Sequence, residues 1–105
     1  MSWVKVIPLN DLEESQGMLV EMNGERIALF RIGNEVFAIA DTCSHAEASL
    51  SEGEVFDEAV ECPRHGSEFD LRTGEPNSLP ATRPVAVFPS KVEEGDVYLM
   101  VGEES

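Results

Sequence analysis

Residues 18–40 read MLVEMNGERIALFRIGNEVFAIA and contain the strongest fold signal in the chain. The pairs Asn23-Gly24 and Gly33-Asn34 each predict a two-residue hairpin turn, because both residue types accept the positive φ angles that such turns need. The segments around these turns are rich in Val, Ile, Leu and Phe, which favour strands; they span residues 18–22, 25–32 and 35–40. The stretch therefore predicts a three-stranded antiparallel meander.

Further strands are expected on both sides of this meander. They span residues 3–7, 85–89 and 96–101, with a connection at 92–95, while residues 9–15 predict a turn or one helical turn that Asn10 would cap. Between 41 and 84 the apolar runs are short and Gly and Pro are frequent, so this region needs a metal or a cross-link to hold it. We therefore expect one all-β domain over 1–105. Its base is an antiparallel sandwich or barrel-like structure built from 1–40 and 85–105, and a small subdomain at about 41–84 is inserted into it.

The charge and composition exclude several classes of function. Seven basic against 21 acidic side chains give a net charge of −14, which repels nucleic acid and anionic membrane surfaces. No apolar run approaches the roughly 18 residues of a membrane-spanning helix, and the amino end does not resemble a signal peptide. We therefore expect a cytoplasmic protein, in which a disulfide between Cys43 and Cys62 is disfavoured and the thiols are available for metal binding.

Two short segments contain all the cysteine and histidine of the chain. They are Cys43-Ser44-His45 and Cys62-Pro63-Arg64-His65, and sixteen residues separate them. A [2Fe-2S] cluster that has two thiolates on one iron and two imidazoles on the other needs this mixed donor set. The segments therefore predict four cluster ligands, with Gly66 allowing a close approach of the backbone.

Three alternative roles remain open for these four residues. Two Cys and two His can bind one tetrahedral zinc, although zinc fingers usually place like residues in the same arm. A thiol activated by an imidazole can act as a nucleophile, but this would leave one Cys and one His unused. The four residues can also be unrelated structural positions.

The pattern Cys-x-His, sixteen residues, then Cys-x-x-His resembles that of Rieske-type ferredoxins, and the similarity covers nearly the whole chain. The runs at 49–53 and 69–75 also resemble the soluble ferredoxins of bacterial ring-hydroxylating dioxygenase systems. The resemblance implies a Rieske-type fold and one cluster per chain. It assigns the inner iron to Cys43 and Cys62 and the outer iron to His45 and His65.

The same resemblance implies an electron carrier that is not an enzyme and has no small-molecule substrate of its own. It would carry single electrons from an NAD(P)H-dependent flavoprotein reductase to a terminal, aromatic-ring-hydroxylating oxygenase. The alternatives are an accessory carrier for another pathway, such as iron–sulfur assembly, and a structural Cys2His2 zinc module that mediates interactions. The expected exit for the electron is the imidazole edge of His45 and His65, with Arg64 among the residues around it.

The resemblance also implies a proline-containing third loop, for which residues 76–80 are the candidate. Respiratory Rieske proteins have a disulfide-forming Cys at two places where this chain has Ala48 and Arg64. They also have a Tyr hydroxyl where this chain has Phe69, which is expected to pack under the loops. Because these features raise the reduction potential, we expect a value near the low end of the Rieske range, about −150 to +300 mV.

Overall fold

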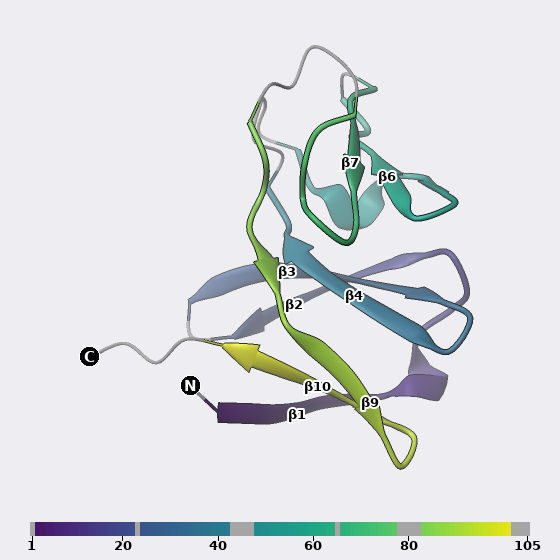
Figure 1. Cartoon of the computed structure of the whole chain (residues 1–105), viewed down its shortest axis with the longest axis vertical. Helices are drawn as coiled ribbons and strands as arrows, with labels where there is room; N and C mark the ends of the chain where they lie inside the picture. The colour runs from purple at the N-terminus through teal and green to yellow at the C-terminus, as the bar shows by residue number, and fades with distance from the viewer. Residues whose placement is uncertain (1, 23, 43–47, 65, 78–82, 102–105) are drawn as a thin grey trace.

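Three small sheets are stacked in this computed structural model, which describes residues 2–22, 24–42, 48–64, 66–77 and 83–101 (Figure 1). The middle sheet is antiparallel, and its strand order is β2-β3-β4-β8. Its strands are β2 (Gly17–Met22), β3 (Glu25–Ile32), β4 (Glu35–Ala40) and β8 (Val87–Phe88). The predicted meander is therefore confirmed as β2, β3 and β4.

The two hairpins of the middle sheet have the turns that the sequence predicts. Met22 pairs with Glu25, and Ile32 pairs with Glu35, so each connection is two residues long. Gly24 and Gly33 have φ angles of 79° and 64°, which other residues adopt only at a cost.

The second sheet has the order β1-β10-β9 and lies below the middle sheet in Figure 1. Its strands are β1 (Ser2–Pro8), β9 (Ser90–Glu93) and β10 (Asp96–Val101). The strand expected at 85–89 is confirmed only over Val87–Phe88, and β9, which was not expected, follows it and pairs with β10 instead of with the middle sheet. Pro89, which has no amide hydrogen to donate, separates the two. The expected connection at 92–95 is shorter as well, since only Glu94 and Gly95 lie outside the strands.

A short 3-10 helix, η1 (Leu9–Asp11), follows β1. The prediction of one helical turn here is confirmed, but the role given to Asn10 was wrong. Pro8 occupies the N-cap position, and no side chain caps the helix. Asn10 lies inside the single turn, where it cannot act as an N-cap.

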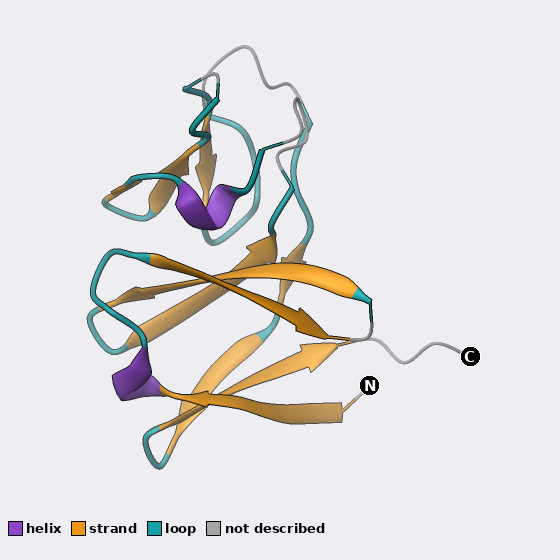
Figure 2. Ribbon diagram, turned by 180° about the vertical axis from the view of Figure 1, so that it is seen from behind, coloured by secondary structure: helices purple, strands orange, loops and turns teal. Residues whose placement is uncertain are grey.

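The third sheet is the smallest and carries the segments around the expected site. It consists of β5 (Val55–Phe56), β6 (Ala59–Glu61) and β7 (Glu68–Asp70), in that order. The 3-10 helix η2 (Leu50–Glu52) lies close to this sheet (Figure 2). Leu50 is fully buried there and packs in the same hydrophobic cluster as residues of β6 and β7.

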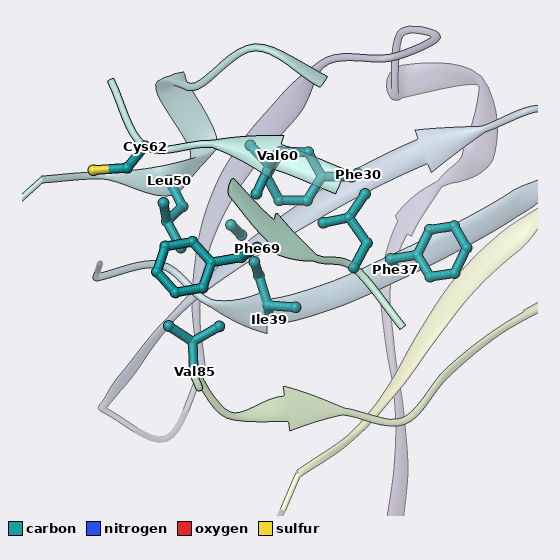
Figure 3. Packing of buried hydrophobic residues seen from close by; sticks show 10 residues of the cluster. Phe30, Phe37, Ile39, Leu50, Val60, Cys62, Phe69 and Val85 are labelled. Carbon is teal, nitrogen blue, oxygen red and sulfur yellow. The ribbon is translucent and has the colours of Figure 1, made fainter. Parts of the chain in front are cut away.

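The middle sheet separates two hydrophobic cores. Ala28, Phe30, Phe37 and Ile39 face the core shared with η2, β6 and β7 (Figure 3). Alternate residues of the same two strands face the core shared with β10, where they pack against Val97 and Leu99; these residues are Ile27, Leu29, Val36 and Ala38. Both faces of β3 and β4 are therefore covered, which explains why their sequences are apolar without alternation.

Arg72 connects the small sheet to the middle sheet. Its guanidinium donates to Glu58, in the turn between β5 and β6, at 2.6 and 3.0 Å, and to Glu35 of β4 at 3.1 Å. It also lies 5.0 Å from the centre of the Phe37 ring. The hydrogen bond from Arg72 is the main reason why the pKa of Glu58 is lowered, and the same bond raises the pKa of Arg72.

Within the described residues, we found no helix with the length and apolar character needed to cross a membrane.

Candidate metal centre

The second predicted ligand segment forms the loop between β6 and β7. Glu61 pairs with Glu68, and next to this pair the Cys62 amide donates to the Ser67 carbonyl at 2.7 Å. The Gly66 amide donates to the Cys62 carbonyl at 2.9 Å, and Gly66 has a φ of 78°. The loop is therefore a tight turn whose first residue is the candidate ligand Cys62.

Cys62 is a free thiol and is only 1 % exposed. It packs at the edge of the upper core with Leu50, Val60 and Phe69, all fully buried, and Figure 3 shows its sulfur directed away from the rings of Phe30 and Phe37. The expected packing of Phe69 under the loops is thus confirmed. A thiol at this edge is shielded on its inner side, while its sulfur is directed out of the core.

The first predicted ligand segment is closed at its base by Asp41. Thr42 forms an antiparallel bridge with Ser49, and the Leu50 amide donates to the Asp41 carbonyl at 2.7 Å. The Asp41 carboxylate, 1 % exposed, accepts bonds from Ser49 Oγ at 2.6 Å and from the Ser51 amide at 2.9 Å. These bonds fix the two ends of the segment 43–48 next to each other.

A third contact to the same carboxylate comes from the neighbouring strand. Arg26 of β3 places Nη2 3.4 Å from Asp41 Oδ2. A nearly buried carboxylate is costly unless it is hydrogen-bonded and paired, and here three partners supply that compensation. The base of the first segment is therefore held mainly by the hydrogen bonds to Asp41 and by backbone pairing.

The bases of the two segments are connected through the chain that follows η2. The Glu61 amide donates to the Glu54 carbonyl at 2.8 Å. Gly53 lies so close to β6 that a Cβ placed on it would be 2.0 Å from the Glu61 carbonyl oxygen. Only glycine allows this approach, which brings the chain after η2 against the strand that ends at Cys62.

A groove of about 530 Å³ lies beside the second segment. Its described walls come from residues that follow the first segment in sequence and from the second segment itself; the described lining residues are Ala48, Ser49, Glu52, Pro63 and Arg64. Of the candidate third loop, Pro76 forms a bridge with Phe69 of β7, and the Asn77 amide donates to the Glu68 carbonyl. Residues 78–80 of that loop lie outside the described residues.

Of the four predicted ligands, the structure describes Cys62 alone. Cys43, His45 and His65 lie outside the described residues, so the ligand set as a whole stays a prediction. The parts that are described fit a [2Fe-2S] group. A reduced thiol lies at the edge of a hydrophobic core, and both segments start from bases that are joined by hydrogen bonds.

Sequence reasoning missed the roles of Asp41 and Arg72. An acidic residue after a strand is usually solvated, so the sequence does not predict that Asp41 is buried. The pair Ser49 and Ser51, eight and ten residues later, is the only available signal, since two hydroxyl residues on one short segment can serve a carboxylate.

The chain is similar to known proteins over nearly its whole length. A family model described as the Rieske [2Fe-2S] domain matches residues 2–89. The ferredoxin subunit of anthranilate 1,2-dioxygenase from Burkholderia cepacia is 42% identical over 100 residues, which cover 95% of this chain and 93% of the relative. The ferredoxin subunit of 3-phenylpropionate/cinnamic acid dioxygenase from Escherichia coli K12 is 41% identical over 104 residues, which cover 98% and 97%.

The fold is also similar to that of solved structures. A chain in a complex of reduced oxygenase and oxidised ferredoxin in carbazole 1,9a-dioxygenase has a TM-score of 0.86 and 41% identity. The alignment covers 92% of the present chain and 91% of that chain. The three stacked sheets described above are therefore shared with a protein of a dioxygenase system.

Proposed function

Because the chain belongs to the Rieske [2Fe-2S] family, we propose that four of its side chains hold the single cluster: Cys43, His45, Cys62 and His65. The family match favours this cluster over the zinc centre and the Cys–His nucleophile that the residues alone left open. Following the family pattern, Cys43 and Cys62 bind the inner iron, and His45 and His65 bind the outer iron.

The observation that carries this assignment is the position of Cys62. Its free thiol lies where the bases of both ligand segments are joined, at the edge of the upper core. In a reducing compartment, this arrangement leaves the thiol available as a thiolate ligand. Both cysteines of the chain are then used as ligands, so we also propose that the protein works in the cytoplasm.

The chain is a ferredoxin, an electron-carrying component and not a catalyst. The cluster, when bound, accepts one electron and releases one electron reversibly. The electrons come from an NAD(P)H-dependent flavoprotein reductase and go to a terminal oxygenase that hydroxylates aromatic rings. The solved complex of an oxygenase with its ferredoxin in carbazole 1,9a-dioxygenase supports this choice of acceptor.

The chain's own residues hold the ligand segments and keep water out. Leu50, Val60 and Phe69 have no exposed surface and shield the inner side of Cys62. Asp41 holds the base of the first segment through Ser49 and Ser51. The sheet arrangement supports a division into a base, 1–40 and 85–105, and a cluster-binding subdomain at about 41–84, which remains part of the proposal.

Electron paramagnetic resonance on the dithionite-reduced protein tests the ligand set. Two imidazole ligands give a lower average g than four thiolates, so the spectrum reports His45 and His65 directly. Cys62→Ser is expected to weaken or abolish cluster assembly, and His65→Cys is expected to lower the reduction potential, because it adds a thiolate charge. A colourless protein that holds zinc after anaerobic reconstitution with iron and sulfide would refute the proposal.

The partner assignment is tested by the salt dependence of electron transfer. With a net charge of −14, the ferredoxin is expected to be steered toward a basic docking surface. The rate of oxygenase reduction should therefore fall as salt shortens the screening length to about 8 Å at 0.15 M. A rate that does not change with salt would mean that the acidic surface has no part in docking.

A further inference from the structure

Arg64 differs from the other basic side chains in having no partner within the described part of the chain. The chain has seven basic residues, and the other six all interact intramolecularly: Lys5, Arg26, Arg31, Arg72, Arg83 and Lys91. Arg64 is exposed, although the chain carries 21 acidic side chains that could pair with it. No described residue of the chain therefore neutralises its guanidinium.

In the sequence, Arg64 is next to His65, one of the two residues expected at the electron exit. It follows Pro63 and lies two residues after Cys62. It lines the groove of about 530 Å³ together with Ala48, Ser49, Glu52 and Pro63. Glu52 is the only acidic residue among the described residues that line this groove, and no ion pair joins it to Arg64. The groove therefore contains a cation that the described residues of its walls do not neutralise.

This arrangement favours a particular kind of occupant. The net negative charge of the protein attracts a basic surface, but this long-range attraction does not select one orientation of the two proteins. A single cation within an acidic surface is repelled by a uniformly basic partner, unless a carboxylate of that partner faces it. Arg suits this role because its planar fork can bind a carboxylate through two hydrogen bonds, and because it is weakly hydrated.

We propose that Arg64 fixes the orientation of the ferredoxin on its terminal oxygenase by pairing with a carboxylate of the oxygenase in this groove. This inference rests on the proposed function and names the specificity-determining residue of the docking surface. Redox partners meet through small contacts, so one oriented ion pair beside the electron exit can decide which encounters are productive.

Two variants of the holoprotein separate orientation from general charge. Arg64→Gln and Lys5→Gln each make the protein more negative by one charge. Lys5 lies on β1, in the sheet farthest from the loops, where it pairs with Asp96 at 3.4 Å (Figure 1). The probes are the purified oxygenase components of the 3-phenylpropionate/cinnamic acid and anthranilate 1,2-dioxygenase systems, whose ferredoxins are 41–42% identical to this chain.

The readout is the Kd of the oxidised ferredoxin for each oxygenase, measured by titration calorimetry at low salt, together with the midpoint potential of each variant. Arg64→Gln is expected to raise the Kd about three- to tenfold, while Lys5→Gln changes it less than twofold. Arg64→Lys should recover part of the loss, because it keeps the charge but not the fork.

The possible outcomes distinguish this inference from the proposed function. Wild-type protein that binds and reduces an oxygenase, with equal Kd values for the two Gln variants, would overturn the role of Arg64 alone. A shift in midpoint potential in Arg64→Gln without a change in Kd would also overturn it, since Arg64 would then act on the cluster. Wild-type protein that reduces neither oxygenase would overturn the proposed function, and the inference with it.

Discussion

Asp41→Ala is expected to lower the free energy of unfolding by about 2–4 kcal/mol. The carboxylate accepts two short hydrogen bonds, from Ser49 Oγ and the Ser51 amide, and a bond to a charged group contributes about 1.5–3 kcal/mol. Part of this loss is recovered, because Ser49 Oγ can keep its 2.8 Å bond to Ser51 Oγ. The 3.4 Å contact with Arg26, half of whose side chain is exposed, adds little.

The measurement is thermal unfolding of the as-isolated holoprotein, followed by far-ultraviolet circular dichroism. A loss of 2–4 kcal/mol corresponds to a fall in Tm of about 10–25 °C for a domain of this size. Asp41→Asn should lose less, because its side-chain oxygen can still accept from the Ser51 amide. Asp57→Asn is the matched control, since Asp57 is exposed in a turn with a φ of 55° that Asn also accepts.

The same variants report on the metal centre. Because Asp41 holds the base of the segment that contains Cys43 and His45, Asp41→Ala should also lose iron to a chelator faster than Asp57→Asn does. An Asp41→Ala protein within about 1 kcal/mol of wild type, with the same rate of iron loss, would show that the carboxylate does not hold the segment.

Three further outcomes follow from single residues. Gly74→Ala should destabilise the protein by about 1–3 kcal/mol more than Gly33→Ala does. Both glycines have a positive φ, but only at Gly74 would the new Cβ lie 2.1 Å from a backbone oxygen, that of Val85. Equal losses of stability in denaturant unfolding would contradict this packing. The hydrogen bond from Arg72 lowers the folded-state pKa of Glu58 from 4.5, so the stabilisation by Glu58 is present above that value and is lost as the pH falls through the folded-state pKa. When Tm is measured from pH 7 to pH 3, it should therefore fall less for Glu58→Gln than for wild type. Parallel curves of Tm against pH would exclude this pairing with Arg72. Protein-film voltammetry should give a midpoint near the low end of the range of about −150 to +300 mV, because Phe69 is buried without a hydroxyl; a value above about +200 mV would contradict this.

Local chemistry decided which parts of the fold could be predicted. The hairpins of the middle sheet follow from turn residues and apolar runs that are adjacent in sequence, so their strands were placed correctly to within a residue. The separation of β8 from β9 at Pro89 could not be predicted in the same way. It occurs because β8 pairs with β4 of the middle sheet, whereas β9 pairs with β10 of the second sheet. Strand pairing of this kind is a tertiary property.

The candidate site shows the same division. The mixed Cys and His spacing favoured an iron–sulfur cluster, and its resemblance to the Rieske pattern, together with the runs at 49–53 and 69–75, predicted the family. The burial of Asp41, and the lack of a partner for Arg64 among the residues that the structure describes, became visible only when residues far apart in sequence were brought together. The sequence shows that these charged side chains are present, but only the fold shows which of them have a partner of opposite charge or a hydrogen bond.

The double coverage of β3 and β4 has a consequence for how the molecule opens. These strands are enclosed on both faces, while the three strands of the small sheet are only two or three residues long. Amide hydrogen exchange should therefore be slowest in β3 and β4 and faster in β5, β6 and β7. We therefore expect a partial opening of the small sheet that leaves the other two sheets folded, so that a chain without iron can accept a new cluster without complete refolding.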